Sequence, residues 1–138
     1  MLRNLRILAV DDDEDVLELV EAYLVDKGFI VETRRNAREA LDVLRDHDID
    51  LVLSDIRMAG MTGFELLTAA RAAHPEIGIV LMTAHADEYP MSQALRAGAD
   101  GYLTKPFSLQ KLSLIFEESY WRALSRHDWW ERHAAVNG

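Results

Sequence analysis

The chain has 138 residues, a length that suits one domain with a complete hydrophobic core. Its formal net charge of −9 argues against a nucleic-acid-binding surface, which requires a basic stripe. The absence of cysteine excludes disulfides and thiolate metal sites. The N-terminal apolar run is too short for a signal peptide, and no run approaches the roughly 18 residues of a membrane span. We therefore expect a cytoplasmic protein without membrane contact.

Five apolar runs predict β-strands, at residues 5–10, 29–33, 49–54, 77–82 and 100–104. The segments "ILAV", "LVL" and "IVLM" are apolar without alternation, which is typical of strands that are covered on both faces of a sheet. The second run, "FIVET", is more mixed and suits an edge of the sheet.

Helical patterns separate these runs. Residues 16–24 carry apolar side chains at helical spacing. Capping signals begin the next two helices, because Asn36 stands three positions before Glu39 and Thr62 three positions before Glu65.

Two further helices follow the fourth and fifth strands. We expect Pro90 in the first turn of the fourth helix, Gly98 at its end, and Ser108 as the cap of the fifth helix. The alternation of strand and helix predicts an α/β fold, in which a doubly wound, five-stranded parallel sheet has helices on both faces. Five such units fit the strand order 2-1-3-4-5, in which ligands bind beyond the carboxyl ends of strands one and three.

Acidic residues stand at both of these strand ends. Asp11 and Asp12 follow the first strand, and Asp55 follows the third. Because the two strands are neighbours in the predicted order, the three carboxylates should meet. Such a cluster raises its own pKa values or recruits a cation. Oxygen ligands without thiolates favour Mg²⁺ or Mn²⁺.

A purely structural explanation also exists for the acidic run. Carboxylates can cap the first helix and interact favourably with the positive end of its dipole. We accept this explanation for Glu14 and Asp15, and in part for Asp13.

Four motifs, "ILAVDDDED", "DLVLSDIRMAGMTGFELL", "IVLMTAHAD" and "GADGYLTKPF", occur in order at the ends of strands one, three, four and five. Over about residues 4–118 the chain therefore resembles the receiver domain of two-component response regulators. The resemblance implies a flavodoxin-like receiver fold over residues 4–118. Residues 119–138 are then expected to form a C-terminal helical extension.

The resemblance implies a phosphorylation site. Asp55 matches the phosphoacceptor, and Asp11 and Asp12 match the acidic pair that holds Mg²⁺ together with Asp55. Asp12 is expected to be a direct ligand and Asp11 to act through water. The backbone carbonyl of Arg57 matches the remaining protein ligand of the metal.

The same resemblance assigns residues that bind and sense the phosphoryl group. Thr83 and Lys105 match the hydroxyl and the lysine that contact it, and Tyr102 matches an aromatic switch. The Lys105–Pro106 peptide bond matches one that is cis in the family. Taken alone, these residues also fit a strand-end hydroxyl, a surface lysine and a half-buried tyrosine.

Two positions beside the site tune the lifetime of the aspartyl-phosphate in this family. They are Arg57, two residues after Asp55, and His85, two residues after Thr83. We expect both side chains to control the access of water. The chain departs from the family at Ala59, where proline is usual, so the rigidity of this loop is in doubt.

The resulting functional prediction is a signalling switch. A sensor histidine kinase or a histidine phosphotransfer protein would supply the phosphoryl group. The surface formed by the fourth helix, the fifth strand and the fifth helix would then change. Enzymatic activity would be limited to Mg²⁺-dependent self-phosphorylation and slow autodephosphorylation.

Three alternatives belong to other functional classes. A receiver-like protein-interaction module without phosphorylation is the first. A phosphohydrolase of the haloacid dehalogenase type is disfavoured, because Arg57 stands where such enzymes carry a second aspartate. A flavin-binding protein is disfavoured by the acids that follow the first strand.

The C-terminal segment is rich in aromatic residues. All three tryptophans of the chain, Trp121, Trp129 and Trp130, lie in it, beside apolar residues such as Leu114 and Leu124. This composition predicts an interaction surface. A homodimer could form through this tail or through the face of the fourth helix, fifth strand and fifth helix. The alternative is that the tail folds back on its own domain.

Overall fold

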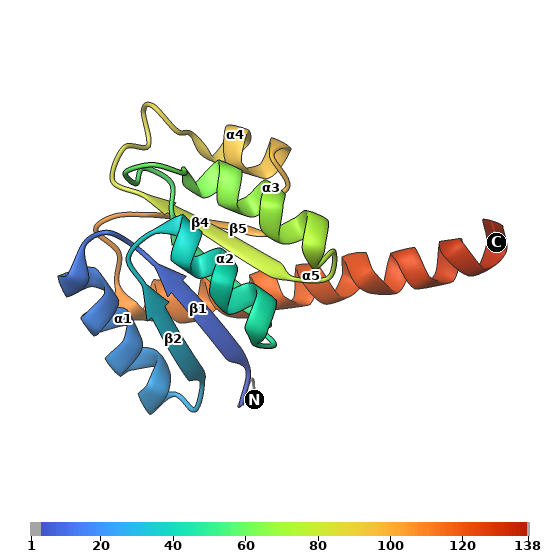
Figure 1. Ribbon diagram of the computed structural model, residues 1–138, viewed down its shortest axis with the longest axis horizontal. Coiled ribbons are helices and arrows are strands. Elements are labelled where there is room, and N and C mark those ends of the chain that lie inside the picture. Colours follow the sequence, from blue (N-terminus) through green and yellow to red (C-terminus); the bar gives the residue numbers. More distant parts are fainter. Residues whose placement is uncertain (1–3, 138) are drawn as a thin grey trace.

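The computed structural model describes the backbone of residues 4–137 and the side chains of residues 4–126. Five parallel strands form one sheet in the order β2-β1-β3-β4-β5 (Figure 1). The predicted strands and their order are thereby confirmed, with small shifts at the strand ends. The strands are β1 (Arg6–Val10), β2 (Ile30–Arg34), β3 (Leu51–Asp55), β4 (Gly78–Thr83) and β5 (Gly101–Thr104).

A helix follows each strand, as predicted. The Thr62 side chain and Glu65 make both bonds of a capping box, and the Asn36 side chain accepts a hydrogen bond from the Glu39 N–H. Pro90 is the N-cap of its helix and therefore lies one residue before the expected first turn. The helices are α1 (Glu14–Asp26), α2 (Ala37–Asp46), α3 (Gly63–Ala73), α4 (Met91–Arg96) and α5 (Leu109–Asn137).

The sheet has a hydrophobic cluster on each face. Along β1, Leu8 belongs to the cluster that includes residues of α2, α3 and α4, and Ile7 belongs to the cluster that includes residues of α1 and α5. Alternate side chains of a strand point to opposite faces, so residues 7–10 of β1, 51–53 of β3 and 79–82 of β4 are apolar without alternation. Each fully buried Leu or Ile stabilises the fold by about 1.5–3 kcal/mol.

Helix α5 crosses the expected domain boundary at residue 118 without a break and extends past the sheet (Figure 1). Ser119 and Ala123 are buried, because they continue the stripe of Leu112 and Phe116 at helical spacing. Within residues 4–137, no helix combines the length and the apolar character that crossing a membrane requires.

A buried carboxylate ties the extension to the sheet. Asp100, 4% exposed, precedes β5 and accepts hydrogen bonds from Arg71 of α3 at 3.0 Å, from the Ile79 N–H at 2.9 Å and from Arg126 of α5. Arg122 of α5 also donates to the Asp100 carbonyl at 2.8 Å. The first part of the extension therefore packs on its own domain, in agreement with the alternative that the tail folds back.

Trp121 and Leu124 of the extension remain partly accessible to solvent. Trp121 is 52% exposed and contacts the Tyr120 ring at 5.8 Å, and Leu124 is half-buried. The Trp129 and Trp130 side chains, on which the predicted interaction surface also depends, lie outside the described residues.

Candidate functional site

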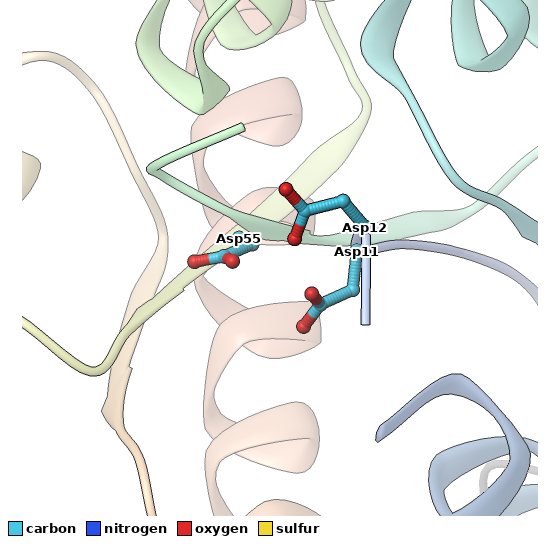
Figure 2. A group of neighbouring side chains, drawn as sticks. All are labelled: Asp11, Asp12 and Asp55. Carbon is cyan, nitrogen blue, oxygen red and sulfur yellow. The ribbon is translucent and has the colours of Figure 1, made fainter. Parts of the chain in front are cut away.

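The predicted acidic cluster lies at the carboxyl ends of β1 and β3. The two strands are paired, with Val10 opposite Ser54, so the residues that follow them meet at one edge of the sheet. One carboxylate oxygen of each of Asp11, Asp12 and Asp55 lies within 4.8 Å of the others. Figure 2 shows the three side chains grouped around the ends of the two strands.

The turn after β1 gives each of its acids a different role. Asp11 is fully buried, and its Oδ1 accepts a hydrogen bond from the Asp13 N–H at 2.9 Å. Asp13 is the N-cap of α1 and accepts a bond from the Asp15 N–H, as expected for a capping residue. Asp12 is exposed and does not cap the helix.

Lys105 brings a positive charge to the cluster. Its Nζ lies 2.5 Å from Asp11 Oδ2 and 3.3 Å from Asp55 Oδ2. Lys105 follows β5 directly, and its peptide bond to Pro106 is cis, as the resemblance implied. The lysine is therefore not a solvated surface residue.

Burial and charge shift the pKa values of the site in opposite ways. Burial raises the pKa of Asp55, the Lys105 ammonium partly offsets this, and the charges of Asp11 and Asp12 raise it further. Burial alone would lower the pKa of Lys105, but its hydrogen bonds and charge interactions with Asp11 and Asp55 together outweigh burial, and the pKa is raised. Lys105 is thus held in its charged form, whereas the ionised form of Asp55 is disfavoured.

The donor set fits a hard divalent cation. The three carboxylates supply oxygen atoms only, which is the ligand type that Mg²⁺ and Mn²⁺ prefer. A single ammonium group leaves the negative charge of three carboxylates incompletely balanced, so a bound cation would relieve their repulsion.

Thr83 and Tyr102 occupy neighbouring strands beside the cluster. Thr83 ends β4 and is fully buried, and its Oγ1 accepts a hydrogen bond from the His85 N–H at 2.8 Å. The hydroxyl proton of Thr83 is therefore available to another acceptor. Tyr102 is half-buried, and its hydroxyl donates to the Tyr89 carbonyl at 2.6 Å.

The two residues expected to tune the lifetime are both exposed. Arg57 lies in the loop after β3, and its Nη1 is 3.6 Å from Glu88 Oε2 in the loop after β4. The His85 side chain is exposed in the same β4–α4 loop. Their proximity to a phosphoryl group stays a prediction.

Two residues near the site received no role from the sequence. Gly63 opens α3, and a Cβ atom added there would lie 2.4 Å from the Asp55 carbonyl oxygen. A glycine at the start of a helix, in "GMTGF", is the signal that could have indicated this close approach. Glu88 is an exposed acid whose partner only the tertiary structure supplies.

Comparison with known proteins agrees with this geometry. The family model described as "Response regulator receiver domain" matches residues 7–117. The transcriptional regulatory protein ZraR of Klebsiella oxytoca is 39% identical over 113 residues, which cover 82% of this chain and 26% of ZraR. The chain thus spans about a quarter of the length of that curated relative.

Solved structures extend the likeness to the fold. A CheY-like receiver domain protein from Methanospirillum hungatei JF-1 has a TM-score of 0.82 at 31% identity, covering 89% of this chain and 98% of that one. The response regulator TrrA from Thermotoga maritima, solved in complex with Mg(2+)-BeF, has a TM-score of 0.75 at 32% identity. The match covers 83% of this chain and 97% of TrrA.

Proposed function

Because the chain belongs to the response regulator receiver domain family, we propose that Asp55 accepts a phosphoryl group from a phosphohistidine donor. The donor would be a sensor histidine kinase or a histidine phosphotransfer protein. The observation that carries the proposal is the position of the Asp55 carboxylate, 3.3 Å from the Lys105 ammonium and in one cluster with Asp11 and Asp12. A module without phosphorylation would not need this costly arrangement of buried charge.

The residues that would hold Mg²⁺, or Mn²⁺, are Asp11, Asp12, Asp55 and the backbone carbonyl of Arg57. When bound, the ion supplies positive charge that balances the carboxylates and the phosphoryl oxygens. Asp12 is exposed and can bind directly, and Asp11 is expected to act through water.

The reaction is an in-line displacement at phosphorus. An oxygen of Asp55 forms a bond to phosphorus while the bond from phosphorus to the donor imidazole nitrogen breaks. The electron pair of that bond stays on the nitrogen, which takes a proton. Lys105, which is 3.3 Å from Asp55, and the Thr83 hydroxyl are proposed to bind the phosphoryl oxygens. In autodephosphorylation a water oxygen attacks phosphorus, which releases inorganic phosphate and restores the Asp55 carboxylate.

The switch would begin at Thr83. Its hydroxyl can donate to a phosphoryl oxygen, which would move the Thr83 side chain toward the phosphoryl group. The vacated space would allow Tyr102 to leave the Tyr89 carbonyl and turn inward. The ligand must bind the active arrangement more tightly for the population to shift. Arg57 and His85, in the two loops beside the site, are proposed to control the access of water.

The output surface is proposed to consist of α4, β5 and α5. Met91 and Leu95 of α4 and Leu114 and Trp121 of α5 are exposed apolar residues on these elements. We propose that a homodimer or an output partner contacts this surface or the C-terminal extension. The receiver would comprise residues 4–118 and the extension residues 119–138.

Intact mass after incubation with acetyl phosphate and Mg²⁺ tests the proposal. Wild type should gain one base-labile phosphoryl group, and both Asp55→Asn and a metal-free sample should gain none. If wild type gained none, binding of beryllofluoride with Mg²⁺ would decide between a site restricted to its own donor and a contact module. A phosphoryl group retained by Asp55→Asn would contradict the assignment of the phosphoacceptor.

A further inference from the structure

An ion pair joins the two loops that flank the proposed phosphorylation site. Arg57 Nη1 lies 3.6 Å from Glu88 Oε2. The loops follow β3 and β4, which are adjacent in the sheet, with Asp55 opposite Met82. The two side chains are 56% and 54% exposed, so their interaction is weak and can be exchanged for a stronger one.

Glu88 belongs to a turn that also holds the partner of the proposed switch residue. The Glu88 N–H donates to the His85 carbonyl at 3.1 Å, and the neighbouring Tyr89 carbonyl accepts the Tyr102 hydroxyl at 2.6 Å. The Tyr89 ring contacts Phe64 at 6.1 Å. The turn thus contacts other elements through the Arg57–Glu88 pair, the hydrogen bond from Tyr102 and the ring of Phe64. Glu88 is adjacent in sequence to Tyr89, which accepts the hydrogen bond from Tyr102.

Phosphorylation changes the charge balance that Arg57 experiences. The three carboxylates would be balanced by the Lys105 ammonium together with a bound divalent cation. A phosphoryl group replaces one carboxylate charge by about −1.5 to −2 charges. The guanidinium of Arg57, two residues from Asp55, is a suitable cation for the added charge, because its planar fork matches phosphoryl oxygens better than a single carboxylate contact.

We propose that Glu88 competes with the phosphoryl group for Arg57, and that phosphorylation transfers Arg57 from Glu88 to the phosphoryl oxygens. This inference rests on the proposed function of Asp55. The transfer removes one anchor of the β4–α4 turn and so favours release of Tyr102 from Tyr89. In this proposal Arg57 contacts the phosphoryl group, whereas Glu88 is a positioning residue that sets the resting state without contacting it.

A double-mutant cycle with beryllofluoride and Mg²⁺ tests this competition by calorimetry. Glu88→Gln should raise the beryllofluoride affinity about 1.5- to 5-fold, the range that exposed ion pairs span. Arg57→Gln should lower the affinity, and Glu88→Gln should have no further effect in the Arg57→Gln background. Arg57→Lys, which keeps the charge, should retain the effect of Glu88→Gln. The matched control is Asp87→Asn, an exposed acid adjacent in the same turn.

The outcomes separate this inference from the proposed function. Equal effects of Glu88→Gln and Asp87→Asn, or an effect of Glu88→Gln that persists in Arg57→Gln, would overturn the competition and leave the proposed function intact. Failure of wild type to bind beryllofluoride, together with failure to gain a phosphoryl group, would overturn both. The exchange is supported if Glu88→Gln raises the beryllofluoride affinity in wild type and has no effect in the Arg57→Gln background.

Discussion

At the scale of single residues, the site is a local concentration of unfavourable charge. Asp11 and Asp55 are both buried at neighbouring strand ends, where their carboxylates repel each other and lose water. Lys105 compensates part of this repulsion through two contacts. The buried carboxylates therefore lower the stability of the folded domain and are better explained by a chemical role.

The raised pKa of Asp55 predicts how stability depends on pH. Its cause is chiefly burial, and the folded state therefore binds a proton more tightly than the unfolded chain does. For such an acid, the free energy of unfolding decreases as pH rises through the interval between its two pKa values. Without metal, wild type should lose stability relative to Asp55→Asn as pH rises above about 4, the ordinary pKa of an aspartate.

Urea denaturation in EDTA at several pH values measures this difference, with Glu117→Gln as an exposed control. Addition of Mg²⁺ at neutral pH should stabilise wild type more than Asp55→Asn, because a cation that binds the folded state stabilises it. A constant difference between wild type and Asp55→Asn across the pH range would contradict the explanation.

At the scale of elements, α5 is held at two levels. Leu112 and Phe116 pack in the apolar cluster beneath the sheet, and Arg126 reaches the Asp100 carboxylate near the amino ends of the strands. Arg71 of α3 binds the other oxygen of Asp100. Arg71 and Arg126, which lie far apart in the sequence, thus share one buried anion.

Removal of that anion should destabilise the domain. Asp100→Asn leaves two arginine side chains, 20% and 29% exposed, without their counter-charge. Breaking a buried pair costs roughly 3–5 kcal/mol, and partial exposure places the expected loss near the lower end, about 3 kcal/mol. Urea denaturation measures the loss, with Asp48→Asn as an exposed control. A change below about 0.5 kcal/mol, which is typical of surface substitutions, would refute the role of Asp100.

At the scale of the whole molecule, the two ends of the parallel strands hold different groups of charged residues. The proposed phosphorylation site lies at the carboxyl ends of the strands, and the Asp100 cluster lies near their amino ends. Strand β5 connects the two, since Asp100 precedes it, Tyr102 lies within it and Lys105 follows it. A shift of β5 on phosphorylation would reach α5 directly.

The exposed apolar residues of α4 and α5 predict a phosphorylation-dependent association. Mass-averaged size should rise with protein concentration in beryllofluoride and Mg²⁺, and less so without them, because the activated surface is the one proposed to bind a second copy. Leu114→Glu should suppress this association without unfolding the domain, since Leu114 is 56% exposed. A monomer that is independent of concentration in both states would count against the dimer.

The sequence by itself determined the architecture and the meeting of three carboxylates at one end of the strands. The apolar runs and capping signals fixed five strands and five helices, because both depend on local periodicity and local hydrogen bonds. The strand order then brought Asp11, Asp12 and Asp55 together. The roles of Thr83, Tyr102 and Lys105 came from family resemblance, because each residue type alone fits ordinary structural positions.

Only the tertiary structure decided which distant partners meet. Arg57 with Glu88, and Asp100 with Arg71 and Arg126, are pairs from different elements. Charged side chains have no periodicity that identifies a partner, so composition suggested an interaction surface in the tail and did not indicate that Arg126 binds a buried acid. The sequence specified each element through short-range physics, whereas the contacts of α5 and of the loops depend on how the finished elements pack.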